Sequence, residues 1–309
     1  MIGLAICDEN ILSSCAYLPY QILKVRVGEF RAVSRPFAVG DEPFRTMQDK
    51  AQPPMKGRLK THFLPPADVE CFDADDIAVV ADVLRATSVM VAALHAGAAA
   101  IYPCLEVEEA RSLAASKPGA LLCGERQGLP IPHFDMGNSP GDYVGSVCRD
   151  RELIMTTTNG TRAILSSVRC RDVYVLAFTN AAALFEELHG TDRTIHLVCA
   201  GTDGLVSWED TLVCGLLAGA LIEAGHEPAD DATLIATAAC RDSLGSFRAG
   251  SGECREHLLD VLKRGRGGRR VQAIGLEKDI VEVARLDVFD ILVRVVPDPW
   301  RIVRVGRNS

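Results

Sequence analysis

Short apolar runs alternate with longer amphipathic segments from residue 77 onward, and this alternation predicts the fold. Runs such as IAVVADV (77–83) and TIHLVCA (194–200) have the length and the β-branched content of buried strands. Segments such as LEVEEARSLAAS (105–116) and NAAALFEELHG (180–190) read as helices. Because strands that alternate with helices form sheets covered on both faces, we predict a three-layer α/β/α domain with a largely parallel or mixed sheet.

The expected elements follow one another along the chain. Strands are predicted over 77–83, 100–103, 120–125, 153–158, 172–178 and 194–200. Helices are predicted over 87–99, 105–116, 160–168, 180–190, 208–225, 230–244 and 253–265, with a last apolar segment over 289–297. The basic run KRGRGGRR (263–270) is predicted to be a solvated loop, and the alternative for it is a nucleic-acid patch.

The first part of the chain differs from the rest. Residues 1–54 show no clean hydrophobic period and end in the polar, proline-containing stretch EPFRTMQDKAQPP. We therefore divide the chain into an N-terminal extension of unknown role over 1–54 and an α/β domain over 55–309. Two alternatives for the extension stay open: an artefact of the assigned start, with Met55 as the natural first residue, or a genuine N-terminal subdomain.

Composition argues against several classes of protein. The 309 residues carry a net charge of −8, which argues against a general nucleic-acid binder. The N-terminus lacks the basic region of a secretory signal, and the longest apolar stretch, TLVCGLLAGALI, is too short to span a bilayer. The 11 cysteines include no C-x-x-C pair, so no structural zinc site is expected. An odd number of cysteines without a secretion signal predicts reduced thiols in a cytoplasmic protein.

Polar side chains gather where the predicted strands end. Ligands bind outside the carboxyl ends of the strands in open α/β sheets. Five of the predicted strands end in glycines, hydroxyls, acids or arginines, which predicts one shared site for an anionic ligand at the same edge of the sheet. The residues are Asp82, Arg85, Thr87, Ser88, Gly124, Glu125, Arg126, Asn138, Ser139, Thr156, Thr157, Thr158, Asn159, Gly160, Thr161, Thr179, Asn180, Gly201, Thr202, Asp203, Gly204, Ser207, Glu209 and Asp210.

These groups favour the metal-assisted handling of a phosphate. Arg85 and Arg126 can hold anionic oxygens through paired hydrogen bonds. The segment TTTNGT (156–161) offers hydroxyls and backbone N–H groups at the start of a helix. Hard oxygen ligands of the kind that Mg²⁺ takes are offered by four carboxylates, Asp82, Glu125, Glu209 and Asp210.

Structural roles are the alternative for each of these groups. Ser207 and Asp210 fit a capping box, and Glu209 between them favours the dipole of the same helix. Asp82 is harder to explain in this way, because a carboxylate inside an apolar strand needs a partner or a cation. An ion pair between Asp82 and Arg85 that only closes the strand-to-helix corner is the remaining structural explanation.

Spacing excludes several common phosphatase mechanisms. None of the 11 cysteines has an arginine six positions later, so the cysteine-phosphatase loop is absent. The D-x-D sequence at Asp73 and Asp75 precedes its strand, which is the wrong place for an aspartyl-phosphate nucleophile. The sequence also has no P-loop, no Arg-His-Gly and no H-E-x-x-H.

Five segments, taken in order, resemble the 2-phosphosulfolactate phosphatase family. They are VADVLRATSVMVAALHAGA, GERQGLPIPHFDMGNSP, MTTTNGTRAI, CAGTDGLVSWED and GLEKDIVEVARLD. The match runs from Met55 to the carboxyl end, and none of the segments is a generic fingerprint. Members of this family hydrolyse (R)-2-phospho-3-sulfolactate to 3-sulfolactate and phosphate with Mg²⁺, in coenzyme M biosynthesis. His133 departs from the glycine that the family usually has before Phe-Asp.

The resemblance implies a soluble Mg²⁺-dependent phosphomonoester hydrolase with an α/β/α fold of its own. It implies catalytic roles for Asp82, Arg85, Glu125, Arg126 and Asp210, and metal ligation by Asp82, Glu125, Glu209 and Asp210. Implied substrate contacts are Thr87, Ser88, Asn138, Ser139, Thr157, Thr158, Asn159, Gly160, Thr161 and Gly201. Asp135, Lys278 and Asp279 also match motif positions of the family. The expected partner is a small anionic phosphorylated substrate, with no nucleic acid and no membrane, and a homo-oligomer is left open. A lyase, a transferase or a non-catalytic protein that binds a small phosphorylated sulfonate or carboxylate is the alternative.

Overall fold

The computed structural model of the chain describes residues 56–245 and 252–306. Its strands are β1 (Arg58–His62), β2 (Ile77–Ala81), β3 (Ala100–Pro103), β4 (Leu121–Arg126), β5 (Leu129–Pro130), β6 (Glu152–Thr156), β7 (Asp172–Leu176), β8 (Ile195–Cys199), β9 (Glu227–Pro228), β10 (Leu292–Val296) and β11 (Arg301–Val305). The expected boundary after residue 54 lies outside the described residues and stays a prediction.

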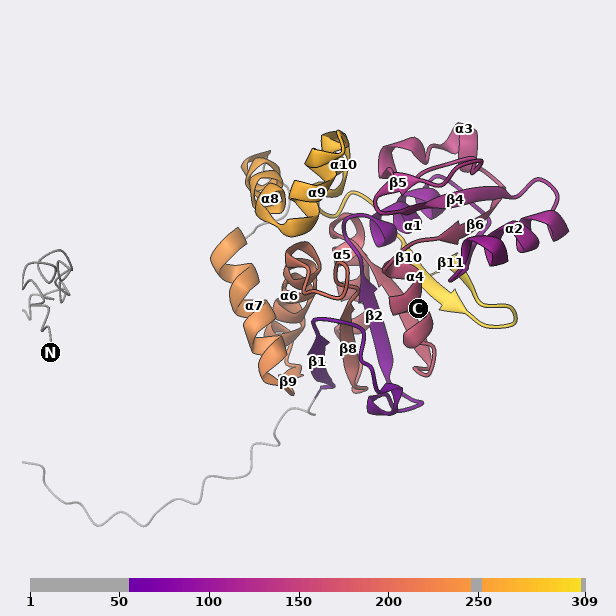
Figure 1. The fold of residues 1–309 in the computed structure, drawn as a ribbon. Coiled ribbons are helices and arrows are strands. Elements are labelled where there is room, and N and C mark those ends of the chain that lie inside the picture. The colour runs from indigo at the N-terminus through magenta and orange to yellow at the C-terminus, as the bar shows by residue number, and fades with distance from the viewer. Residues whose placement is uncertain (1–55, 246–251, 307–309) are drawn as a thin grey trace, which may run out of the picture. The chain divides into compact units, whose positions relative to one another are not determined.

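Ten α-helices occur in the described part of the chain (Figure 1). They are α1 (Ala86–His95), α2 (Val107–Ser116), α3 (Gly145–Cys148), α4 (Gly160–Ser166), α5 (Ala181–Leu188), α6 (Trp208–Glu223), α7 (Asp231–Leu244), α8 (Gly252–Arg264), α9 (Arg266–Ala273) and α10 (Glu277–Val283). Among the described residues, no helix combines the length and the apolar character that a membrane span requires.

The strands of the described residues form one mixed sheet in the order β5-β4-β6-β3-β11-β10-β7-β2-β8-β1-β9. Strands β3, β4 and β6 are parallel to one another, and β7, β2, β8, β1 and β9 form a second parallel set. The hairpin of β10 and β11 joins the two sets through antiparallel pairs, so the sets run in opposite directions. The prediction that these strands end at the same edge of the sheet is therefore wrong, because β2 and β8 belong to one set and β4 and β6 to the other.

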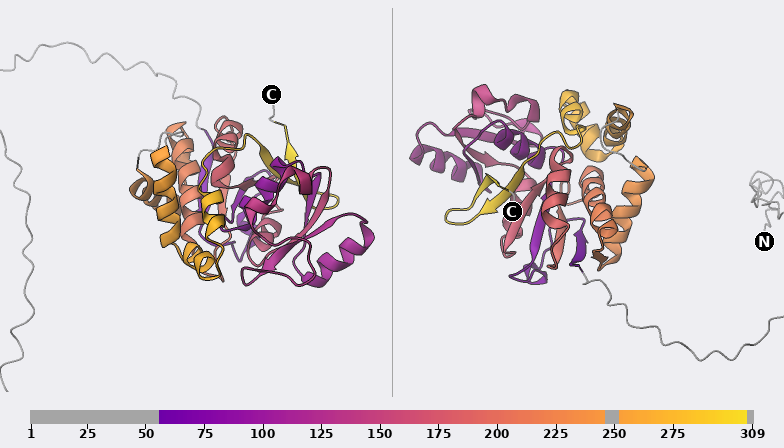
Figure 2. Two further views of the ribbon diagram at one scale, coloured as in Figure 1. Left: turned by 90° about the horizontal axis from the view of Figure 1, so that it is seen from above. Right: turned by 180° about the vertical axis from the view of Figure 1, so that it is seen from behind.

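Helices cover both faces of the sheet, as predicted for a three-layer α/β/α domain (Figure 2). One hydrophobic core packs α5 to α10 against β2, β7 and β8. A second core packs α1 and α4 against the other face. The alternation of inward side chains explains both cores: along β2, Ile77, Val79 and Ala81 enter the first core, whereas Ala78 and Val80 enter the second.

Most of the predicted elements are confirmed. All six predicted strands and all seven predicted helices occur within a few residues of their expected bounds, and the last apolar segment contains β10. The structure adds β1, β5, β9, β11, α3, α9 and α10. Of these, β1, β11 and α10 are short and carry charged residues within the element. The loop predicted over 263–270 is wrong, because Lys263 and Arg264 end α8 and residues 266–270 lie in α9.

The close packing of α6 against α7 gives a test of the fold with a matched control. A Cβ atom on Gly215 would lie 2.1 Å from the carbonyl oxygen of Ala236, whereas one on Gly219, a turn later in α6, would meet its nearest atom at 3.5 Å. We expect Gly215→Ala to lower the free energy of unfolding by about 1–3 kcal/mol through overpacking. Gly219→Ala should raise it by up to about 1 kcal/mol, since alanine favours the helix. Thermal melting measures both changes, and equal shifts would contradict this packing.

Candidate active site

A small cavity lies where the ends of β2, β4, β6 and β8 meet α9, and its volume is about 40 Å³. Such a volume holds a few water molecules. Of the predicted site residues, the lining includes Asp82, Arg85, Glu125, Asn138, Thr158 and Asn159. Thr202, from the polar cluster predicted after the strand over 194–200, lines it as well. The lining also includes residues that sequence reasoning missed, namely Leu84, Gly128, Gly267, Arg270, Val271 and Ile274. The two parallel sets of strands therefore do converge on one site, although they do not share an edge.

Asp82 occupies the corner between β2 and α1, where it is 6% exposed. Its Oδ1 accepts a hydrogen bond from the backbone N–H of Ala86 at 3.2 Å, and its own N–H donates to Thr87 Oγ1 at 2.9 Å. A Cβ atom on Gly160 would lie 2.9 Å from Asp82 Oδ2 and 2.5 Å from Ala86 Cβ. The glycine of the Asn-Gly turn is therefore required for the start of α4 to lie against this carboxylate.

The surroundings of Asp82 are acidic. Burial raises the pKa of Asp82 to about 7, and repulsion from Glu125 and Glu209 adds to the increase. Burial also raises the pKa of Glu209, and it raises that of Asp210 well above the usual range, with repulsion from Asp82 and Glu209 as a further cause. Carboxylates that repel one another in this way favour a proton or a bound cation.

Two of the predicted carboxylates hold the backbone around the cavity. Asp210 accepts hydrogen bonds from the N–H of Val83 at 2.8 Å and from that of Gly201 at 3.1 Å. Glu125 accepts from the N–H of Gly128 at 2.6 Å and from that of Thr158 at 2.8 Å. Each carboxylate therefore fixes two segments that follow different strands, which is a structural role that the sequence did not indicate.

Three buried oxygen atoms near the cavity have no hydrogen-bond partner. They are Asn138 Oδ1, Thr158 Oγ1 and Glu209 Oε2, and Asn138 and Thr158 line the cavity. A buried oxygen without a partner is costly, and a missing ligand is one explanation for it. Oxygen donors are also the ligands that Mg²⁺ prefers, and Mg²⁺ usually takes one or two carboxylates together with substrate phosphates and water. The donor set of Asp82 and Glu209 therefore fits such an ion.

A metal cage built from protein alone is not present in the described residues. Within 56–245 and 252–306, no group of three or more His, Cys, Asp or Glu side chains is arranged so that it could hold a metal ion. Metal ligation by Asp82, Glu125, Glu209 and Asp210 as a set stays a prediction.

Arg85 lies at the cavity but is already paired. Its Nη1 contacts Asp279 Oδ2 at 2.5 Å, and the two side chains are only 3% and 6% exposed. Its Nη2 donates to the carbonyl oxygen of Gly128 at 2.5 Å, and Ser139 Oγ donates to the same oxygen of Asp279 at 3.0 Å. The structural alternative of an Asp82–Arg85 pair is replaced by a pair between Arg85 and Asp279, which joins α10 to the corner after β2.

Arg126 is not among the residues that line the cavity. Its guanidinium donates to the carbonyl oxygens of Glu125 and Leu105, both at 2.9 Å, and to Thr156 Oγ1 at 2.8 Å. These contacts tie the end of β4 to the end of β6 and to the segment after β3. The structure brings Arg126 to Glu125 and Thr156 but not to the cavity wall, and its predicted role at the phosphate stays a prediction.

The remaining predicted contacts form the frame behind the cavity. Thr157 and Thr161 exchange hydrogen bonds between each backbone N–H and the other's hydroxyl, at 3.2 and 3.1 Å. Ser88 Oγ donates to the carbonyl oxygen of Val83 at 2.8 Å. The N–H groups of Thr157, Thr158 and Thr161 donate within the protein, and the residues of the TTTNGT segment that line the cavity are Thr158 and Asn159.

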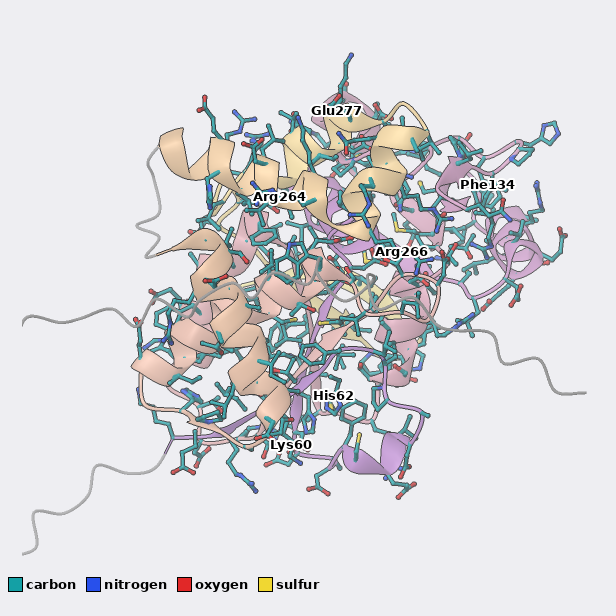
Figure 3. All side chains as sticks on the ribbon, turned by 60° about the vertical axis from the view of Figure 1, so that its left-hand side comes forward. Lys60, His62, Phe134, Arg264, Arg266 and Glu277 are labelled. Atoms are coloured by element: carbon teal, nitrogen blue, oxygen red, sulfur yellow. The ribbon has the colours of Figure 1, made fainter. Side chains whose placement is uncertain are left out.

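Helix α9 forms a wall of the cavity, and its glycines explain why it can lie there. A Cβ atom on Gly267 would lie 1.7 Å from Glu209 Oε1, and one on Gly268 would lie 2.0 Å from the carbonyl oxygen of Leu262. Figure 3 labels Arg264 at the end of α8 and Arg266 at the start of α9, on either side of the tight turn. The segment is rich in glycine because it packs closely, and the prediction of a solvated loop is wrong for this reason.

A sequence signal for α9 does exist. Gly267, Val271 and Ile274 follow one another at intervals of four and three residues, which places them on one helix face, and all three line the cavity. If glycine is treated as a small apolar residue, the apolar positions of this basic segment follow the period of a helix. The positive charge of the run 263–270 favours a solvated loop instead, which is why the helix was not predicted.

The chain is similar to proteins of one family. A family model described as 2-phosphosulpholactate phosphatase matches residues 63–297. A protein of Deinococcus radiodurans named "Probable 2-phosphosulfolactate phosphatase" is 35% identical over 242 residues, which cover 78% of this chain and 94% of the relative. Relatives of the same name from Pseudothermotoga lettingae and Symbiobacterium thermophilum are 33% and 36% identical, over 72% and 74% of this chain and 90% and 94% of their own lengths. The chain therefore belongs to the 2-phosphosulpholactate phosphatase family.

Proposed function

We propose that this protein is a Mg²⁺-dependent phosphatase that hydrolyses 2-phospho-3-sulfolactate, or a similar small phosphorylated acid, to 3-sulfolactate and phosphate. Family membership supports the reaction class. The observation that carries the assignment of the site is the cavity at Asp82, where buried carboxylates and unpartnered oxygens face the same small space. Hydrolysis adds water across the P–O bond, so the oxygen of the sulfolactate hydroxyl leaves with a proton and phosphate is released.

In this proposal Asp82 and Glu209 would hold the ion, which would supply positive charge to stabilise the transferring phosphoryl group. Thr158 Oγ1 and Asn159 line the same cavity and bind the phosphoryl group. Asp210 and Glu125 keep the segments after β2, β4, β6 and β8 in place through their bonds to backbone N–H groups. Charged and polar groups that are held in place before the reaction usually make the largest contribution to the catalysis of phosphoryl transfer.

Chelation tests the metal. Phosphate release from 2-phospho-3-sulfolactate should stop after treatment with EDTA and return with Mg²⁺ or Mn²⁺, since a site built of oxygen ligands suits these ions better than Zn²⁺. Because the pKa of Asp82 is raised to about 7 and an ion binds only its ionised form, the apparent affinity for Mg²⁺ should rise from pH 6 to pH 8. The measurement is a Mg²⁺ titration of the initial rate at each pH.

The outcomes of the same assay separate the alternatives. Full turnover after exhaustive chelation would exclude the metal. Calorimetric binding of the substrate in Mg²⁺ without any turnover would indicate a non-catalytic binding protein. Consumption of the substrate without release of free phosphate would indicate a lyase or a transferase.

A further inference from the structure

The part of the cavity wall that α9 forms carries a positively charged side chain, Arg270, which has no role in the proposed phosphatase reaction itself. We propose that Arg270 binds the sulfonate of the substrate and thereby sets the preference for a sulfonated phosphate ester. This inference rests on the proposed function and adds a specificity-determining residue to it. It is carried by the position of Arg270, by the state of the other arginine at the cavity and by the charge of the substrate.

Arg270 reaches the cavity from a helix that glycines allow to lie close to it. Its Nη1 contacts Asp203 Oδ2 at 2.7 Å, which ties α9 to the loop after β8. Its Nε lies 3.9 Å from the point that a Cβ atom on Gly128 would occupy. Gly128 is the residue whose carbonyl oxygen accepts from Arg85, so the two guanidinium groups both approach the same backbone segment.

The two arginines differ in what they can still bind. Of the described residues that line the cavity, Arg85 and Arg270 carry positive charge. Arg85 is neutralised by the buried carboxylate of Asp279. The Arg270–Asp203 pair is 33% and 41% exposed and uses Nη1. A guanidinium has five N–H donors in a planar fork, so Arg270 can hold Asp203 and still present donors to an anionic oxygen.

The charges of the substrate and the neighbours of Arg270 together indicate that Arg270 binds the sulfonate. The phosphate of the substrate carries a charge of about −2 at pH 7, and its sulfonate and carboxylate add one negative charge each. The proposed place of the phosphate is at Asp82, Thr158 and Asn159, at the ends of β2 and β6. Arg270 lies on α9 beside Val271 and Ile274, whose apolar side chains suit the carbon that bears the sulfonate.

Arg266 provides a matched control from the same helix. It approaches the same oxygen of Asp203 at 3.4 Å, but it lines the neighbouring groove with Trp208 and not the cavity. Replacing Arg266 therefore removes the same charge and a contact to the same carboxylate without removing a group from the cavity wall. A general loss of positive charge near the site would affect both variants equally.

The test compares two substrates that differ by one group, 2-phospho-3-sulfolactate and 2-phospholactate, which lacks the sulfonate. For Arg270→Ala we expect KM for the sulfonated ester to rise about ten- to a hundredfold with kcat nearly unchanged, as for the loss of a charge-assisted hydrogen bond. KM for 2-phospholactate should stay within about twofold, a change too small for a lost charge-assisted bond. Arg270→Lys should recover part of the loss, since it keeps the charge but not the fork, and Arg266→Ala should behave as the unmodified protein with both substrates.

Melting temperatures of all variants accompany the kinetics, so that unfolding is not mistaken for lost recognition. An equal rise of KM for both substrates in Arg270→Ala, or no change for the sulfonated one, would overturn the inference. An equal loss in Arg266→Ala would also overturn it, because it would show a long-range effect of charge. If the unmodified protein hydrolyses neither substrate, the proposed function fails first and the inference fails with it.

Discussion

Asp82→Asn should lower kcat by about a hundred- to a thousandfold while the protein stays folded. Asparagine keeps the shape of the side chain and an oxygen that can accept the bond from Ala86, so the corner between β2 and α1 is retained. It removes the negative charge that the proposed ion requires, and additional Mg²⁺ should recover little activity. Steady-state kinetics on 2-phospho-3-sulfolactate, together with a melting curve, measures both parts of this prediction.

The same variant has a predicted signature in stability. The pKa of Asp82 is raised in the folded protein to about 7, whereas an unfolded aspartate titrates near about 3.9. The folded state therefore binds the proton of the Asp82 carboxyl group more tightly than the unfolded state does. In metal-free protein, the stability contributed by this protonated carboxyl is fully present below about pH 4 and is lost as the pH rises through about 7. Asp82→Asn does not lose that contribution, so at pH 8 in EDTA it should melt at a higher temperature than the unmodified protein.

The stability and turnover of Asp82→Asn also show which result would contradict the role of Asp82 in the active site. A large drop in the melting temperature of Asp82→Asn, with normal turnover in the fraction that stays folded, would show that Asp82 is structural. A stable and inactive variant would support the site. The pH series separates these outcomes, since a structural role gives no reason for the difference in melting temperature to grow between pH 4 and pH 8.

Asp279→Ala should lower the free energy of unfolding by about 3–5 kcal/mol, because it leaves the guanidinium of Arg85 buried without its partner. Arg85 and Asp279 are separated by 194 positions in the sequence, and their side chains are 3% and 6% exposed. The loss should be smaller in the double variant Arg85→Met/Asp279→Ala, which removes both charges. Thermal or denaturant unfolding of the single and double variants measures the coupling.

Glu277, on the same helix as Asp279, is the control. It pairs with Lys263 at 2.8 Å, but the two side chains are 55% and 30% exposed. Exposed pairs contribute little to stability, so Glu277→Ala should melt close to the unmodified protein. Equal losses for the two alanine variants would show that removing any carboxylate from α10 has the same effect, and would contradict the role given to the buried pair.

The sequence predicted the layers of the fold because apolar runs report burial directly. The run 77–83 is apolar on both sides of the strand, and β2 indeed feeds both cores. The reversal of direction between the two sets of strands was not predictable in the same way. It depends on β10 and β11, which come last in the chain and insert between β3 and β7, and a hydrophobic pattern does not encode which strands become neighbours.

The candidate site was predicted in its composition but not in its pairings. The position after a predicted strand identifies several site residues, and the structure places four of them around one cavity: Asp82, Glu125, Asn138 and Thr158. The partner of Arg85 lies far away in the sequence, so no local pattern indicated that its charge is already neutralised. Arg126 and Arg85 look alike as residues that follow strands, and only the fold shows that one lines the cavity whereas the other ties strand ends together.

The contribution of α9 was missed for a different reason. Glycine has a low intrinsic preference for helices, so RGRGGRR indicates a loop when it is considered alone. Packing overrides that preference here, because Gly267 and Gly268 lie where a larger side chain would collide with Glu209 and Leu262. Arg270 reaches the cavity only through this packing, and its candidate role therefore appears in the structure and not in the sequence.

Phosphate and 3-sulfolactate, quantified in the same reaction, show whether this cavity is the active site. The protein is given 2-phospho-3-sulfolactate with Mg²⁺, beside an equal amount of folded Asp82→Asn protein. We expect the two products to appear in equal molar amounts and at a rate at least about a hundredfold above that of the variant. Equal rates for the two proteins, or no release of phosphate from the sulfonated ester, would contradict the assignment of this cavity as the active site of a 2-phosphosulfolactate phosphatase.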